Sequence, residues 1–123
     1  MQAGDLTAAE SHYRQALPGR PTAETHNGLG FVLARQNRTD EAVVEFRKAI
    51  TADPKFVPAY NNLAEALAKQ GQLEDAADYY RRSLAQRPNP SVYNALGAVL
   101  RQLGREDEAE QQFSKAKSLQ FAR

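Results

Sequence analysis

Residues 59–88, AYNNLAEALAKQGQLEDAADYYRRSLAQRP, read as two amphipathic helices separated by Gly71. Leu63 and Leu67 lie one turn apart on the first helix, and Tyr80 belongs to the apolar face of the second. Glycine tolerates the positive φ at which many helices end, and the closing proline blocks helix continuation. Because one helical hairpin cannot bury both of its apolar faces, this stretch predicts neighbours of the same kind.

The pattern recurs along the chain at spacings of 34 and 33 residues. We call a set of equivalent positions in successive repeats a column. The apolar and small-residue columns are Leu29/Leu63/Leu96, Leu33/Leu67/Leu100, Gly30/Ala64/Gly97, Ala42/Ala76/Ala109, Phe46/Tyr80/Phe113 and Ala49/Ser83/Ala116, and the turn column is Asn37/Gly71/Gly104. The columns predict one array covering residues 1–123, with repeats at 23–56, 57–89 and 90–123.

The first 22 residues match only the second half of a repeat, through Ala9, Tyr13 and Ala16. We therefore expect a second helix whose partner helix precedes Met1 in a longer array. The pattern predicts seven helices, at 5–17, 22–36, 39–52, 56–70, 73–86, 90–103 and 106–119. Thr22 and Asn89 are suitable N-caps for two of them, the latter with Pro90 in the first turn.

Composition excludes several classes of protein. The net charge of +1 offers no excess of cations for nucleic acid or an anionic membrane surface. The absence of cysteine excludes disulfides and thiolate metal sites, and fits the cytoplasm or the periplasm. No apolar run is long enough to span a membrane and no leader is apparent, so we expect a soluble segment of unassigned compartment, with the cytoplasm favoured.

The period, the helical hairpin and the small-residue columns together resemble the tetratricopeptide repeat. The resemblance covers essentially the whole chain. It implies an all-α, right-handed solenoid of antiparallel helix pairs, whose first helices line a concave groove that binds a protein or peptide. His26, Ser83 and Phe121 depart from the family pattern, which has an aromatic residue, alanine and proline at those columns. Phe121 predicts that the last helix runs on, or that its end docks.

The pentatricopeptide repeat, which binds RNA, is a second possible resemblance, through the run Val92-Tyr93-Asn94-Ala95-Leu96. Its period of 35 residues differs from the spacings here, and the neutral charge does not favour RNA.

Residues suited to catalysis or metal binding do not cluster in the sequence. His12 and His26 occupy unrelated columns, and neither a catalytic triad nor a phosphate-binding loop is present. We therefore expect no enzyme activity, no cofactor and no metal.

The candidate binding residues lie on the first helices. Asparagine, a poor choice within a helix, fills one whole column, and its amide suits the backbone of an extended peptide. An equal alternative is that each asparagine bonds within the array. Cations on the same face suit acidic groups, although a solvated helix face would also carry them. The candidate groove residues are Asn27, Phe31, Arg35, Asn61, Asn62, Glu65, Lys69, Asn94 and Arg101.

The family's carboxylate clamp and its asparagine ladder in O-linked GlcNAc transferases share only Asn62 with this chain, so neither is expected here. A structural arm in a larger protein, self-associating through uncapped ends, is the alternative function. Leu6, Leu17, Leu119 and Phe121 would be the exposed apolar residues that pair such ends.

Overall fold

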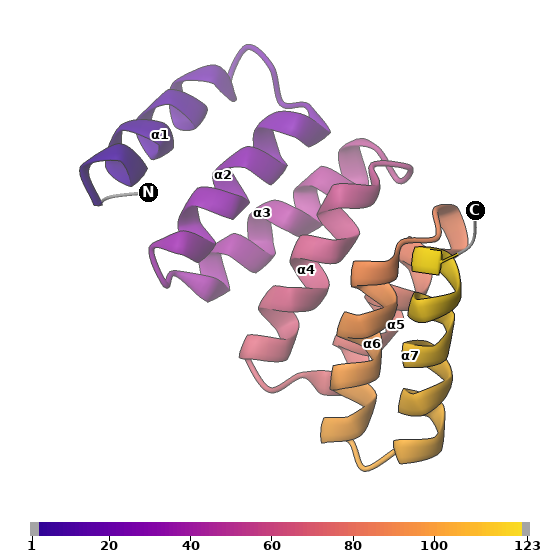
Figure 1. The fold of residues 1–123 in the computed structure, drawn as a ribbon. Coiled ribbons are helices and arrows are strands. Elements are labelled where there is room, and N and C mark those ends of the chain that lie inside the picture. The colour runs from indigo at the N-terminus through magenta and orange to yellow at the C-terminus, as the bar shows by residue number, and fades with distance from the viewer. Residues whose placement is uncertain (1–2, 122–123) are drawn as a thin grey trace.

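The computed structural model describes residues 3–121, which form seven α-helices and no strand (Figure 1). The outer bounds expected for the array, residues 1 and 123, lie outside this range. The helices are α1 (Ala3–Ala16), α2 (Ala23–Arg35), α3 (Thr39–Ala52), α4 (Val57–Lys69), α5 (Leu73–Gln86), α6 (Pro90–Gln102) and α7 (Glu106–Phe121). The all-α solenoid is confirmed, and the helix ends fall close to the predicted ones.

Local sequence signals fix the helix ends. The Thr22 hydroxyl accepts a hydrogen bond from the Thr25 amide, and Asn89 accepts one from the Ser91 amide at 2.8 Å. The φ angles of the three turn residues are positive, at 63° for Asn37, 82° for Gly71 and 81° for Gly104. Each turn reverses the chain within a few residues, so the two helices of a repeat pack against each other.

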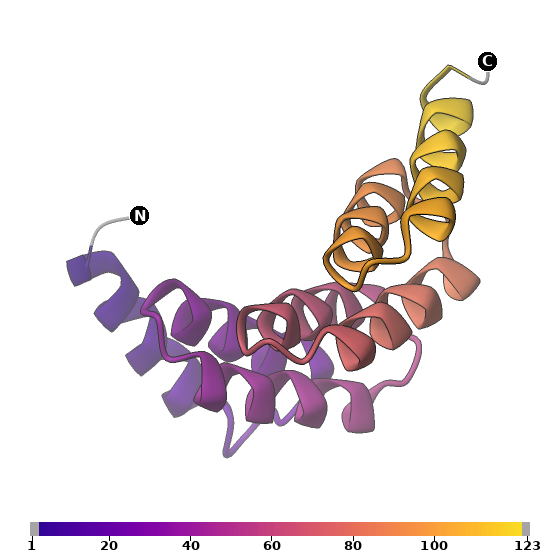
Figure 2. The same cartoon turned by 90° about the horizontal axis from the view of Figure 1, so that it is seen from below.

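Helices α2 and α3, α4 and α5, and α6 and α7 form the three pairs, and each pair packs on the next through α3–α4 and α5–α6 contacts. Helix α1 packs on α2 at the start of the array. The succession of pairs bends into a curved array, which Figure 2 shows from below. One continuous core of leucine and alanine columns runs through α2 to α7.

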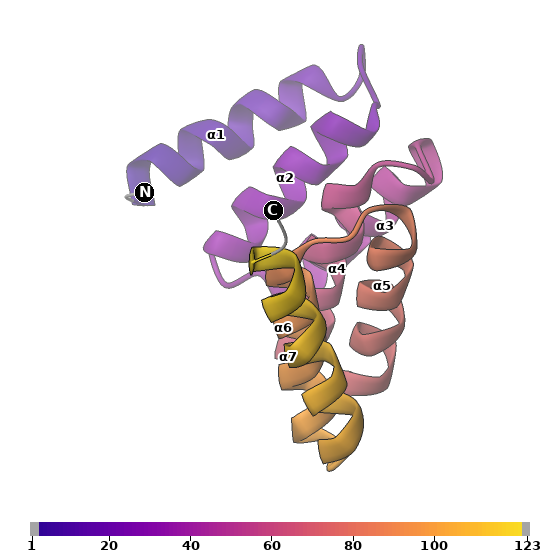
Figure 3. The ribbon, with the colours of Figure 1, turned by 45° about the vertical axis from the view of Figure 1, so that its right-hand side comes forward.

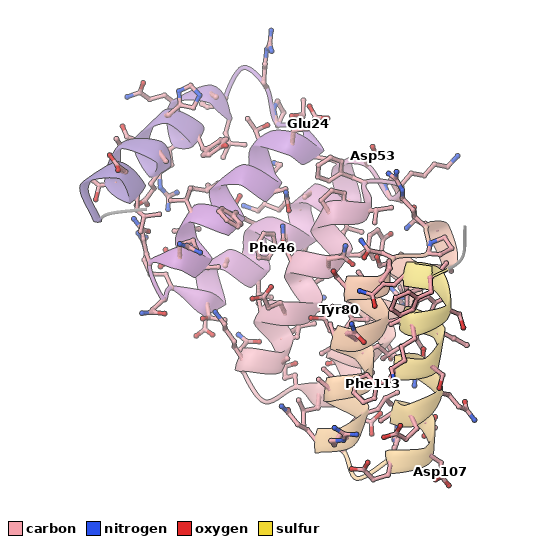
Figure 4. All side chains as sticks on the ribbon, in the orientation of Figure 1. Glu24, Phe46, Asp53, Tyr80, Asp107 and Phe113 are labelled. Atoms are coloured by element: carbon pink, nitrogen blue, oxygen red, sulfur yellow. The ribbon has the colours of Figure 1, made fainter. Side chains whose placement is uncertain are left out.

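Phe46, Tyr80 and Phe113, labelled in Figure 4, form the aromatic column; the first two are buried and Phe113 is half-buried. A Cβ atom built on Gly30 would lie 2.6 Å from the Phe46 ring, and one on Gly97 would lie 2.6 Å from the Phe113 ring. These two glycines are therefore required for close packing of ring against helix.

The two ends of the array differ in how their apolar side chains are covered. Leu6 was expected to be exposed, but it is buried with 8% exposure, and Leu17 is half-buried, so α1 already packs with much of its apolar face inward. Helix α7 does run on to Phe121, which is 81% exposed and docks on none of the described residues. Helix α7 is therefore longer than the other second helices and ends in an apolar side chain open to solvent.

Candidate functional site

A pocket of about 140 Å³ lies between α2 and α4, the first helices of two successive repeats. Both helices contribute to its wall, and helix α3 contributes two further side chains. The lining residues are Phe31, Ala34, Arg35, Thr39, Phe46, Asn62, Glu65, Ala66 and Lys69. The structure thus brings together five of the nine candidate residues, namely Phe31, Arg35, Asn62, Glu65 and Lys69.

The pocket combines an exposed ring with two cations. Phe31 is 47% exposed, although large apolar side chains in this array are mostly buried. The guanidinium carbon of Arg35 lies 6.0 Å from the centroid of the Phe31 ring. Arg35 and Lys69 are the last residues of α2 and α4, so their charges also complement the negative ends of two helix dipoles.

Neither cation is neutralised by a carboxylate in residues 3–121. Several other arginines of the chain are paired with acids, as Arg38 is with Glu10 and Glu41, and Arg105 with Glu74. Glu65 is the acidic residue of the pocket, and its charge helps to raise the pKa of nearby Tyr80. The pocket therefore carries two free cations beside one carboxylate, a local positive excess.

The three asparagines of one column have three different environments. Asn27 accepts a hydrogen bond of 2.9 Å from the side-chain amide of Asn62, across α2 and α4. The side-chain oxygen of Asn61 is buried and accepts no hydrogen bond from the described residues. Asn94 is exposed. The three side chains therefore do not form a uniform ladder along the groove. The Asn27–Asn62 pair instead joins two first helices.

Asn94 and Arg101 lie apart from the other candidate residues. They line a separate depression between α6 and α7, together with Phe113 and Lys117. Arg101 is also engaged there, because Glu110 and Glu106 both pair with it, at 2.9 and 3.3 Å. The columns place Arg101 near the groove, but the pairing depends on side chains of α7 that no column of the first helices reveals.

Sequence reasoning missed two other contributions. Thr39 and Phe46 reach the pocket from the second helix of the repeat, whereas the candidate residues all belong to first-helix columns. His26 meets Glu45 at 2.9 Å where a family member would have an aromatic residue, and both side chains are largely buried. This contact explains the departure from the family pattern at His26, since a buried imidazole requires a polar partner.

Two features are absent from the part of the chain that the structure describes, a metal-ligand cluster and a membrane-spanning helix. Residues 3–121 hold no cluster of three or more side chains of the kinds that ligate metals. None of their helices combines the length and the hydropathy that a membrane span requires.

Family models confirm what the columns indicate. Models described as tetratricopeptide repeat match residues 1–55, 33–100 and 90–123. The chain belongs to the tetratricopeptide repeat family. Its repeats form a protein-interaction module of the general kind that this family provides.

Relatives and solved structures agree with this assignment. The chain is 36% identical over 87 residues to a peroxisomal targeting signal receptor of Eremothecium gossypii, covering 70% of this chain and 15% of that protein. It is 30% identical over 95 residues to small glutamine-rich tetratricopeptide repeat-containing protein 2 of Mycosarcoma maydis, covering 75% of this chain and 26% of that one.

A crystal structure of MamA superposes with a TM-score of 0.88 at 21% identity, covering 92% of this chain and 67% of that one. At that identity the similarity shows the tetratricopeptide fold alone. The chain spans only about a seventh to a quarter of the length of curated relatives such as these.

Proposed function

We propose that this tetratricopeptide array binds an extended protein segment in its concave groove, centred on the pocket between α2 and α4. The observation that carries the proposal is the combination of an exposed Phe31 with the unpaired cations Arg35 and Lys69 in one pocket. An apolar side chain of the segment contacts the ring, and an acidic side chain next to it lies between the cations. The name of one relative, a peroxisomal targeting signal receptor, is consistent with recognition of a peptide.

Each part of the pocket contributes differently to binding. Covering Phe31 removes apolar surface from water, which adds affinity but does not fix the orientation of the bound segment. Arg35 and Lys69 discriminate by charge, because a basic residue placed between them would be repelled and a carboxylate attracted. Asn62 keeps α2 and α4 in place through Asn27, while Asn61 and Asn94 stay predicted contacts to the segment backbone. Since such a groove exchanges water contacts for ligand contacts, we expect micromolar affinity.

Selection from a random peptide library displayed on phage tests the proposal. Wild-type chain is expected to enrich peptides in which an apolar residue stands next to Asp or Glu. The variant Arg35→Glu/Lys69→Glu is expected to enrich peptides with Lys or Arg there instead. The control Arg20→Glu/Lys55→Glu changes charge equally at exposed positions outside the pocket. Equal peptide preferences for all three proteins would refute the pocket as the binding centre.

A further inference from the structure

The outer face of α6 and α7 lies at the end of the described residues away from α1 (Figure 3). In the two inner repeats the corresponding face receives a helix, because α4 packs on α2 and α3, and α6 packs on α5. Three columns of that receiving face are apolar in both inner repeats and belong to the core or pack against it. They are Ala34/Ala68, Val43/Ala77 and Ile50/Leu84.

All three columns carry charge in the last repeat. Arg101 replaces the alanine, Glu110 replaces valine or alanine, and Lys117 replaces isoleucine or leucine. These three side chains are exposed and line one open depression of about 420 Å³, together with Asn94, Phe113 and Gln120. The face on which a helix packs in the inner repeats is therefore polar here, while the columns around it keep the repeat pattern.

Arg101 also packs over an aromatic ring that a neighbouring helix covers in the inner repeats. Its guanidinium carbon lies 4.9 Å from the centroid of the Phe113 ring, and Glu110 holds the guanidinium at 2.9 Å. In the inner repeats the equivalent rings of Phe46 and Tyr80 are 1% and 7% exposed under neighbouring helices. Phe113 is half-buried, and among residues 3–121 no helix of a following repeat packs over it. The cation over its face reduces the exposed apolar surface and leaves a charged outer layer.

From these contacts we infer that the outer face of α6 and α7 is a polar cap, closed to apolar helix faces, including those of a second copy of this chain. An apolar helix placed there would bury Lys117 without a partner and dehydrate the Arg101–Glu110 pair, both at a cost in free energy. Association of copies end to end, the alternative function considered from the sequence, is therefore opposed at this face. The inference rests on the side chains of α6 and α7 and is independent of the groove.

Restoring the residues of the first full repeat tests the cap. The variant Arg101→Ala/Glu110→Val/Lys117→Ile gives this face the side chains of Ala34, Val43 and Ile50. A matched control, Arg20→Ala/Glu24→Val/Lys55→Ile, makes the same exchanges at exposed positions elsewhere. Sedimentation velocity over roughly two decades of concentration measures the association of each protein, and circular dichroism verifies the helical content.

The cap variant is expected to associate at least about tenfold more strongly than the wild type and the control. Equal association of variant and control, with helicity intact, would overturn the inference. The pair Glu110→Val/Lys117→Ile leaves Arg101 in place and removes the nearer of the two carboxylates that pair with it. Weaker association of this pair than of the triple variant supports a covering role for Arg101, and equal association removes that role. Should the triple variant lose helicity, the pair alone decides between cap and no cap.

Discussion

Ser83 occupies a column that holds alanine in the neighbouring repeats, at Ala49 and Ala116. Its side chain is fully buried, and its hydroxyl makes no hydrogen bond to the described residues. A buried hydroxyl without a partner costs free energy that a methyl group does not. Ser83→Ala is therefore expected to raise the free energy of unfolding by about 1 kcal/mol.

Denaturant unfolding measures this change. Ser114→Ala, at an exposed site of α7, is the control for the higher helix propensity of alanine. A gain at Ser83 no larger than that at Ser114 would show that the buried hydroxyl costs nothing.

Tyr80 gives the protein a dependence on alkaline pH. Burial, and secondarily the nearby Glu65 carboxylate, raises the pKa of the Tyr80 phenol to about 12. An unfolded tyrosine loses its proton near pH 10, so the contribution of Tyr80 to stability is complete below about pH 10. This contribution is lost as the pH rises from about 10 to about 12, by no more than about 2 kcal/mol.

Unfolding measured at several alkaline pH values, for wild type and Tyr80→Phe, tests this dependence. The variant is expected to show a smaller alkaline loss of stability, since it has no proton to lose at that site. Parallel curves for the two proteins would contradict the assignment.

At the scale of elements, a polar junction fastens α1 to the first pair. Arg38, beyond the end of α2, reaches Glu10 of α1 at 2.9 Å and Glu41 of α3 at 2.7 Å. Hydrogen bonds from Arg14 and from Arg38 lower the pKa values of the Glu10 and Glu41 carboxyls, respectively. For a lowered pKa, the stabilisation is present above the ordinary carboxyl value and disappears as the pH falls through the lowered one.

We therefore expect α1 to undock first on acidification, below about pH 4. Tyr13 of α1 packs directly over Gly28, where an added Cβ would lie 2.4 Å from the ring, so the Gly28 amide NMR signal reports docking through the ring current. Arg38→Ala should shift this signal toward its undocked position already at neutral pH, whereas Arg20→Ala should not. An unchanged Gly28 signal in Arg38→Ala would disprove the role of the junction.

The sequence predicted these elements well because packing in a repeat depends on columns. Leu29, Phe46 and their equivalents identify the buried faces, and Asn37 and the two glycines locate the turns. Columns do not predict polar partners, since these depend on how far one helix is offset along the next. The sequence therefore left open whether Asn27 faces a ligand, whereas the structure pairs it with Asn62. Likewise, the column of Arg101 indicates the groove, while its carboxylate partners lie on α7.

At the scale of the whole molecule, the curved array has two contrasting surfaces, the α2–α4 pocket and the charged face of α6 and α7. The α2–α4 pocket presents a ring and two free cations, whereas at the α6–α7 face the cation Arg101 is paired and covers the ring of Phe113. The same residue types thus serve recognition at one place and protection at the other, and the difference lies in whether a carboxylate neutralises the arginine. This contrast supports the proposal that a partner binds at the α2–α4 pocket.

A charge exchange between pocket and ligand tests this central claim most directly. The test uses a peptide selected on the wild type, a copy with its acidic residue changed to Lys, and the variant Arg35→Glu/Lys69→Glu, with affinities measured by isothermal titration calorimetry. Each mismatched pair is expected to lose at least about tenfold in affinity, because attraction becomes repulsion, and the doubly exchanged pair is expected to recover most of it. Losses that add, with no recovery in the doubly exchanged pair, would contradict the account.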